Sequence, residues 1–198
     1  MKELLTERYG PQADDIQDIF LTEDQIKHRV KELAQSITID YEGHDLLIVG
    51  VLKGVMCFVA DLIREITIPI TVDFMAIAAY SSKEPFRGTV RFIKDLDLPV
   101  EGRDVLFVED VVDTGLTLNY LLRNLRKRNP ASLEVCTLFD RPTRRLLDLP
   151  IRYKGFQLPD FFVVGYGLDY REQYRGLPFV GILKPSLLGG RNKIENVF

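Results

Sequence analysis

The chain has few of the residues that cross-link a protein or ligate a transition metal. It contains two cysteines and two histidines among 198 residues. Cys57 and Cys136 lie in unrelated apolar stretches and form no C-x-x-C pair, so we interpret both as reduced packing residues of a cytoplasmic protein. His28 and His44 lack the spacing of metal ligands, and we interpret them as surface or helix-face residues.

Long apolar runs and a surplus of positive charge are absent as well. No apolar run approaches the ~20 residues of a membrane span, and the starting segment MKELLTERYGPQADD lacks the basic start and apolar centre of a signal peptide. The formal net charge is -3, which disfavours broad attraction to nucleic acid. We therefore expect neither a membrane nor a nucleic acid as a partner.

The residues that are present have the composition of a globular protein. Hydrophobic residues make up 46% and charged residues 28% of the chain, whose length suits one domain. Apolar runs alternate with segments of helical periodicity. The runs include LLIVGVL, DVLFVED, SLEVCTLF and DFFVVGYG, and the helical segments include LTEDQIKHRVKELAQSI, VMCFVADLIREI and LTLNYLLRNLRKRN. This alternation predicts an α/β fold with a parallel sheet flanked by helices.

Charged or glycine-bearing segments follow four of the predicted strands. They are residues 53–54, 109–117, 140–145 and 165–175. In parallel α/β sheets, ligands bind at the carboxyl ends of the strands. We therefore expect a binding site where these segments converge.

The segment VEDVVDTGLT, residues 108–117, combines acids with a loop suited to phosphate. Unpaired backbone N–H groups at the start of the following helix favour an anion. Gly115 permits close approach of the backbone, and Thr114 and Thr117 add hydroxyl donors. The chain has neither a Walker A motif nor a G-x-G-x-x-G motif, which disfavours ATP hydrolysis and dinucleotide binding.

The acids of this segment suit the sugar attached to such a phosphate. Glu109 and Asp110 can accept hydrogen bonds from ribose hydroxyls, directly or through Mg²⁺, which takes few protein carboxylates. Asp113 lies further along, nearer a reacting base. The whole pattern indicates a ribose-5-phosphate site, although Asp113 alone also fits an ordinary helix cap.

The sequence VLFVEDVVDTGLT resembles the phosphoribosyl-pyrophosphate (PRPP) motif of type I phosphoribosyltransferases. Three more segments, VGVLKGVMCFVADL, DFMAIAAY and FFVVGYGLDYREQYRGLP, resemble the hypoxanthine-guanine phosphoribosyltransferases in order and spacing, from about residue 20 to 182. The resemblance implies a Rossmann-like sheet flanked by helices with a small hood. It also implies a single domain, 1–198, with its core at about 45–150 and its hood at about 1–44 plus 152–198.

The same resemblance implies a purine-salvage reaction with Mg²⁺ as cofactor. A 6-oxopurine, hypoxanthine and also guanine, would displace pyrophosphate from PRPP and give IMP or GMP. The family members form homodimers or homotetramers, and we expect the same here. The final segment, residues 184–198, adds nothing to the resemblance.

Residue roles carried over from the family begin with the PRPP side. Asp113 resembles the acid that exchanges a proton with nitrogen 7 of the purine, and Glu109 and Asp110 would bind the ribose and Mg²⁺. Lys53 and Gly54 would bind pyrophosphate, with a cis peptide bond before the lysine; without the resemblance, Lys53 fits a solvated strand-end residue. The 5′-phosphate loop would comprise Val112, Asp113, Thr114, Gly115, Leu116 and Thr117.

The remaining roles concern the base and the closing lid. Phe162 would stack on the purine and the Val163 backbone would bond its edge, although Phe162 in isolation also fits a core aromatic. Asp169 matches an acid near a second Mg²⁺ and the base, and Arg175 matches a pyrophosphate ligand. The lid would begin at Ala79 and Tyr80.

Two positions depart from the family pattern. Ala79 stands where the family usually has serine, and Arg141 stands where it usually has the lysine that meets the 6-oxo group. Arginine still donates but with a different geometry, which leaves the preference among hypoxanthine, guanine and xanthine open. Arg144 and Arg145 fit either pyrophosphate ligands or a solvated basic run.

Two other functions fit the residues less well. A regulator that senses PRPP or nucleotides and binds RNA or DNA would need a basic face or a DNA-binding segment, and the chain has neither a helix-turn-helix extension nor a positive net charge. A transferase for adenine or a pyrimidine is disfavoured by the segment FVVGYGLDY.

Overall fold

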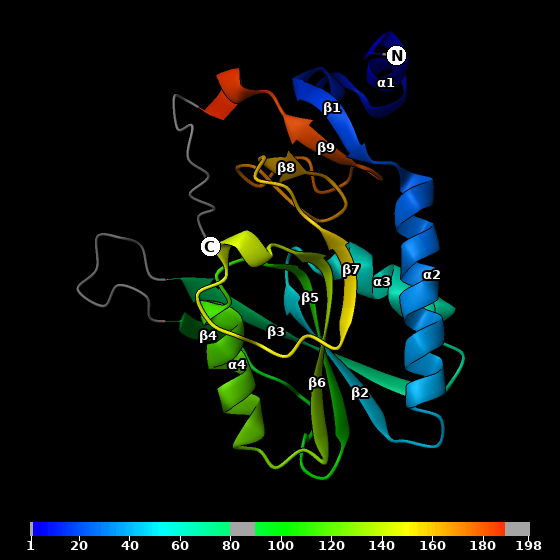
Figure 1. Ribbon diagram of the computed structural model, residues 1–198, viewed down its shortest axis with the longest axis vertical. Helices are drawn as coiled ribbons and strands as arrows, with labels where there is room; N and C mark the ends of the chain where they lie inside the picture. Colours follow the sequence, from blue (N-terminus) through cyan, green and yellow to red (C-terminus); the bar gives the residue numbers. More distant parts are fainter. Residues whose placement is uncertain (1, 80–89, 189–198) are drawn as a thin grey trace, which may run out of the picture. The chain divides into compact units, whose positions relative to one another are not determined.

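The computed structural model describes residues 2–79 and 90–188 (Figure 1). These residues form two compact units. The smaller unit comprises residues 2–29 and 159–188, and the larger comprises 30–79 and 90–158. Each unit has its own sheet. No helix in the described ranges is long and apolar enough to cross a membrane.

The sheet of the larger unit has six strands in the order β4-β3-β2-β5-β6-β7 in the described part of the chain. Neighbouring strands run parallel except β3 and β4, which are antiparallel. The predicted α/β fold with a mostly parallel sheet is therefore confirmed. The strands are β2 (Leu46–Leu52), β3 (Ile70–Ala79), β4 (Val90–Lys94), β5 (Asp104–Val112), β6 (Ser132–Asp140) and β7 (Tyr153–Gln157).

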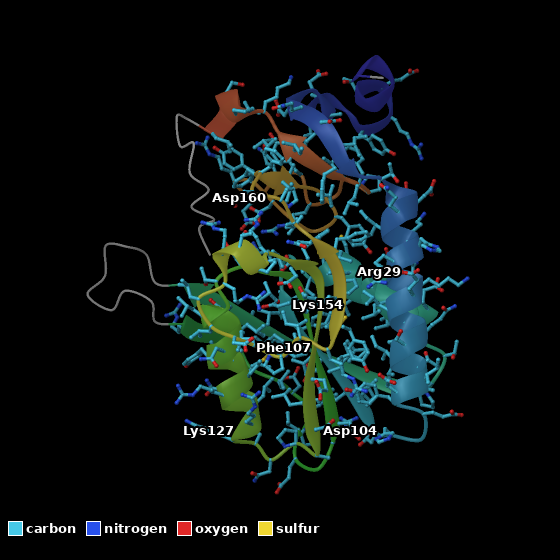
Figure 2. The ribbon with its side chains drawn as sticks, in the orientation of Figure 1. Arg29, Asp104, Phe107, Lys127, Lys154 and Asp160 are labelled. Atoms are coloured by element: carbon cyan, nitrogen blue, oxygen red, sulfur yellow. The ribbon has the colours of Figure 1, made fainter. Side chains whose placement is uncertain are left out.

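Burial explains why these segments form central strands and amphipathic helices. Strand β2 is buried along almost its whole length, as expected for a strand covered on both faces. Helices α3 (Met56–Glu65) and α4 (Leu116–Arg126) lie beside this sheet (Figure 1). In α4 the buried residues recur at helical spacing and pack with Phe107 of β5, which Figure 2 labels within the sheet. They are Leu118, Leu121, Leu122 and Leu125.

Helix α2 (Glu23–Asp40) begins among residues of the smaller unit and ends in the larger. Its start is a capping box, as the sequence predicts: the Thr22 N–H donates to Oε1 of Gln25 at 2.9 Å, and the Gln25 N–H donates to Oγ1 of Thr22 at 3.3 Å. The buried residues of α2 lie on one face. They are Ile26, Val30, Leu33, Ala34 and Ile37.

The smaller unit contains an antiparallel sheet in the order β1-β9-β8. Its elements are α1 (Lys2–Tyr9), η1 (Pro11–Asp15), β1 (Ile16–Leu21), β8 (Val163–Val164), β9 (Val180–Leu183) and η3 (Pro185–Leu188). The predicted strand DFFVVGYG is therefore only two residues long. The apolar core of the smaller unit includes Ile16, Val164, Tyr174 and Phe179. The ring of Tyr9 packs edge to face on that of Phe179, with 5.3 Å between the ring centres.

Candidate functional site

The turn between β5 and α4 has the geometry of an anion site. Gly115 precedes α4 with a left-handed backbone, φ 82°, and a Cβ atom there would lie 2.9 Å from Cδ1 of Leu149. Glycine is therefore the residue that fits. The first N–H groups of α4 lack partners within the helix, and the helix dipole favours a negative group beside them. The predicted 5′-phosphate loop spans this turn: Val112 ends β5, Asp113, Thr114 and Gly115 form the turn, and Leu116 and Thr117 begin α4.

Asp113, the predicted proton-exchanging acid, lies in this turn with its side chain 15% exposed. Its Oδ2 atom lies 3.0 Å from Nη1 of Arg144. Its Oδ1 atom is buried and has no hydrogen-bond partner among the residues that the structure describes. One oxygen of this carboxylate therefore has a hydrogen-bonding capacity that a bound ligand can meet.

The segment after β6 packs against the same turn. Arg145 donates from Nε to the carbonyl oxygen of Asp113 at 3.2 Å and pairs with the carboxylate of Asp140. The Leu146 N–H donates to the carbonyl of Thr114 at 3.0 Å. Arg144 and Arg145 are therefore built into the site, and the alternative of a solvated basic run is wrong. The sequence did not predict these contacts. The one indication in the sequence was a pair of adjacent arginines close to the carboxyl end of a predicted strand.

Arg141, the predicted ligand of the 6-oxo group, is 1% exposed. It follows β6 directly, and its backbone N–H donates to the carbonyl of Val112 at 3.0 Å. Its position is thereby fixed at the carboxyl end of the sheet, next to the phosphate loop. A charged side chain at such a depth is unusual outside functional sites or ion pairs.

The predicted acid pair lies at the end of β5. Burial, followed by the charge of Asp110, raises the pKa of Glu109 well above its usual range. Asp110 is buried, and its Oδ1 atom accepts from the Val111 N–H at 2.7 Å. A divalent cation would relieve the repulsion between the two carboxylates.

The predicted pyrophosphate residues meet this acid pair. Strands β2 and β5 are parallel neighbours, so their carboxyl ends lie together. A Cβ atom on Gly54 would overlap Oδ2 of Asp110. The Leu52-Lys53 peptide bond is cis, as the family resemblance implies. Lys53, Gly54 and Asp110 thus lie together at the carboxyl ends of two neighbouring strands of the larger unit.

The other predicted residues lie in the smaller unit, where two of them are paired. Nη2 of Arg175 lies 2.8 Å from Oδ1 of Asp169, and Nη1 donates to the carbonyl of Gly167 at 2.8 Å. Phe162 packs edge to face on Tyr170 at 5.4 Å between ring centres. Val163 begins β8. These contacts give Asp169 and Arg175 a defined arrangement within a tight loop.

The predicted lid is described only at its start. Ala79 ends β3 and pairs with Val90 of β4. Tyr80 lies outside the described residues.

The described residues include no group of three or more histidine, cysteine or acidic side chains that could hold a metal ion. Mg²⁺ bound together with a phosphate substrate needs only one or two protein carboxylates. Glu109 and Asp110 provide that donor set, and a bound cation would offset the repulsion between their two carboxylates. The residues present therefore fit a substrate-borne Mg²⁺.

Comparison with known proteins gives consistent matches. The profile of the phosphoribosyl transferase domain matches residues 17–171. A hypoxanthine-guanine phosphoribosyltransferase of Bacillus subtilis is 46% identical over 173 residues, covering 87% of this chain and 96% of the relative. The enzyme of the same name from Mycobacterium tuberculosis is 50% identical over 179 residues, covering 87% and 89%. A solved hypoxanthine phosphoribosyltransferase from Staphylococcus aureus superposes with a TM-score of 0.85 at 44% identity, covering 89% of this chain and 96% of that one.

Proposed function

This chain belongs to the phosphoribosyl transferase family, and on that premise we propose that it transfers the 5-phosphoribosyl group of PRPP to a 6-oxopurine. The products are IMP from hypoxanthine or GMP from guanine, together with pyrophosphate, in purine salvage. The observation that carries this proposal is the β5–α4 turn. It joins a glycine-dependent anion site to the acid pair and to an aspartate with one buried oxygen available.

The chemistry follows from the parts of this turn. Nitrogen 9 of the purine attacks the anomeric carbon, the bond from that carbon to pyrophosphate breaks, and the proton on nitrogen 7 passes to Asp113. The transition state resembles an oxocarbenium ion, as in glycoside hydrolysis. Asp113 acts as the general base, while the N–H groups of residues 112–117 bind the 5′-phosphate and so position the ribose.

The leaving pyrophosphate carries most of the negative charge that the site must balance. In our proposal Lys53, Gly54 and Arg175 bind it, and Glu109, Asp110 and Asp169 are the metal ligands. When bound, Mg²⁺ neutralises charge on the departing group. The close contact between Gly54 and the Asp110 carboxylate supports placing the pyrophosphate residues beside the proposed metal ligands.

The purine is assigned to Arg141, Phe162 and Val163. The arginine would donate to the 6-oxo group, the ring of Phe162 would stack on the base and the Val163 backbone would bond its edge. A lid starting at Ala79 and Tyr80 would exclude water, which would otherwise hydrolyse PRPP. We further propose a cytoplasmic homodimer or homotetramer whose residues 1–198 act as one domain, with a core at 45–150 and a hood at 1–44 plus 152–198.

The test is a release assay for pyrophosphate. The protein is incubated with PRPP, Mg²⁺ and one base at a time: hypoxanthine, guanine, xanthine, adenine, uracil or orotate. Release with hypoxanthine or guanine and none with adenine or the pyrimidines is expected. Absence of turnover with every 6-oxopurine would remove the proposal.

A further inference from the structure

Two consecutive arginines bind the same aspartate in different ways. Arg144 binds the side chain of Asp113 through Nη1, 3.0 Å from Oδ2. Arg145 binds the backbone of Asp113 through Nε, 3.2 Å from the carbonyl oxygen. Asp113 is therefore held at both its side chain and its main chain by a segment 31 residues further along.

Both arginines are partly shielded from solvent. The side chain of Arg144 is 29% exposed and that of Arg145 is 14% exposed, whereas Arg64, in a helical surface ion pair with Asp61, is 73% exposed. The short helix η2 (Pro142–Arg144) sets their directions, and the Arg145 N–H donates to the carbonyl of Pro142 at 3.1 Å. Arg145 is anchored in addition by Asp140.

Only one of the two oxygen atoms of the Asp113 carboxylate accepts a hydrogen bond from the described residues. Oδ2 of Asp113 accepts from Arg144, while Oδ1 is buried with no hydrogen-bond partner in the described part of the chain. A buried carboxylate oxygen without a partner is costly, so a protein keeps one where a ligand supplies the donor. The contact of Arg144 with Oδ2 decides which oxygen remains for that donor.

We propose that Arg144 is a positioning residue: it fixes the Asp113 carboxylate so that Oδ1 faces the proton on nitrogen 7 of the purine. This inference rests on the proposed function and extends it. Arg145 holds the main chain of the same residue, so that the carboxylate is fixed relative to the 5′-phosphate loop. In this assignment Arg144 acts through Asp113, because its Nη1 atom contacts the carboxylate.

A double-mutant cycle between Arg144→Met and Asp113→Asn tests this inference. Single-turnover rates are measured with enzyme in excess over radiolabelled hypoxanthine at saturating PRPP and Mg²⁺, because product release can mask the chemical step. Arg144→Met should slow the reaction by roughly tenfold, as expected for a loss of orientation. The same substitution should have no further effect in Asp113→Asn, and Arg144→Lys should recover part of the rate.

The affinity for PRPP distinguishes a positioning role of Arg144 from a phosphate-binding role. The Kd of PRPP, measured by calorimetry, should stay within about twofold in Arg144→Met, since a positioning arginine does not bind the phosphates. Arg64→Met is the matched control, because it removes an arginine from an exposed ion pair and should leave the rate unchanged.

Three results would overturn the inference while the proposed reaction stands. They are an equal slowing by Arg144→Met in the two backgrounds, an unchanged rate in Arg144→Met, and a weaker Kd for PRPP without slower chemistry. Wild-type protein without turnover would be a different failure: it would remove the proposed reaction and the inference together.

Discussion

Gly54, in the turn that follows β2, lies so close to Asp110 of β5 that a Cβ atom on the glycine would overlap Oδ2 of the carboxylate. Two segments about 56 positions apart are thus locked together at the carboxyl edge of the sheet. The contact joins a predicted pyrophosphate residue to a predicted ligand of the ribose and Mg²⁺. A larger side chain at residue 54 would therefore displace the Asp110 carboxylate.

Gly54→Ala should therefore displace Asp110 and impair the use of PRPP. We expect kcat/KM for PRPP to fall roughly 10- to 100-fold, because shifts of about 1 Å in a positioned group have effects of this size. The control is Gly176→Ala, where the added Cβ meets no atom within 4 Å. Full activity in Gly54→Ala would show that Asp110 does not have to stay where it is.

Arg141→Met should weaken the use of 6-oxopurines in particular. A charge-assisted hydrogen bond to the 6-oxo group contributes about 1.5–3 kcal/mol, which corresponds to a loss of roughly 10- to 100-fold in kcat/KM for hypoxanthine. Arg141→Lys keeps a donor and should recover part of the loss. Thermal unfolding of each variant is needed beside the kinetics, because Arg141 is buried. Equal kcat/KM values in all three proteins would remove Arg141 from the base site.

Removal of divalent cations should abolish turnover, and added Mg²⁺ should restore it. Glu109 and Asp110 are a carboxylate pair in which burial and mutual repulsion raise the pKa of Glu109, and a cation offsets that repulsion. Asp110→Asn leaves one carboxylate and should raise the Mg²⁺ concentration for half-maximal rate by roughly tenfold. The measurement is a Mg²⁺ titration at saturating PRPP after treatment with a chelator. Persistent activity in the chelated sample would contradict the metal assignment.

Asp73 predicts a pH-dependent contribution to stability that is independent of the site. Burial by itself raises the pKa of this carboxyl, but hydrogen bonds from three backbone N–H groups and the charge of Lys94 outweigh it, so the pKa lies below its usual value. The donors are the N–H groups of Leu98, Phe74 and Asp97 at 2.8, 2.7 and 2.7 Å. A lowered folded-state pKa means that the stabilisation is complete above the ordinary value of about 3.9 and is lost as the pH falls through the folded-state value.

Asp73→Asn should therefore lower the free energy of unfolding by about 1–3 kcal/mol at pH 7, and the difference from wild type should shrink below about pH 4. Urea unfolding at several pH values gives both quantities. Asp95→Asn is the control, because Asp95 pairs with Arg128 near the surface and should change stability by less than about 1 kcal/mol at pH 7. A difference that stays constant across this pH range would contradict the assignment to the Asp73 carboxylate.

The predictable parts of this molecule are those encoded within short stretches. Apolar runs such as Leu46–Leu52 and the helical spacing of α4 predict the parallel sheet, and the Thr22 capping box predicts the start of α2. Strands β1 and β9 escaped prediction because β1 carries charged and polar residues and its partner lies about 165 positions away. Their pairing depends on contacts that no local pattern records.

The same distinction applies to the site. The residue types in 108–117 predict what the β5–α4 turn binds, because each acts through its own chemistry. The contact of Arg144 with Asp113 could not be predicted, since it depends on how η2 turns after β6. A basic pair next to a strand end is compatible with several roles until its direction is known.

The most direct test of the central claim is the product formed from PRPP, Mg²⁺ and hypoxanthine. Chromatography with nuclear magnetic resonance measures how much IMP appears, with which configuration at the anomeric carbon, and how much pyrophosphate accompanies it. Our account predicts one β-configured IMP for each pyrophosphate, since the purine displaces pyrophosphate with inversion. Pyrophosphate released at the same rate without the base, or with ribose 5-phosphate in place of IMP, would contradict it.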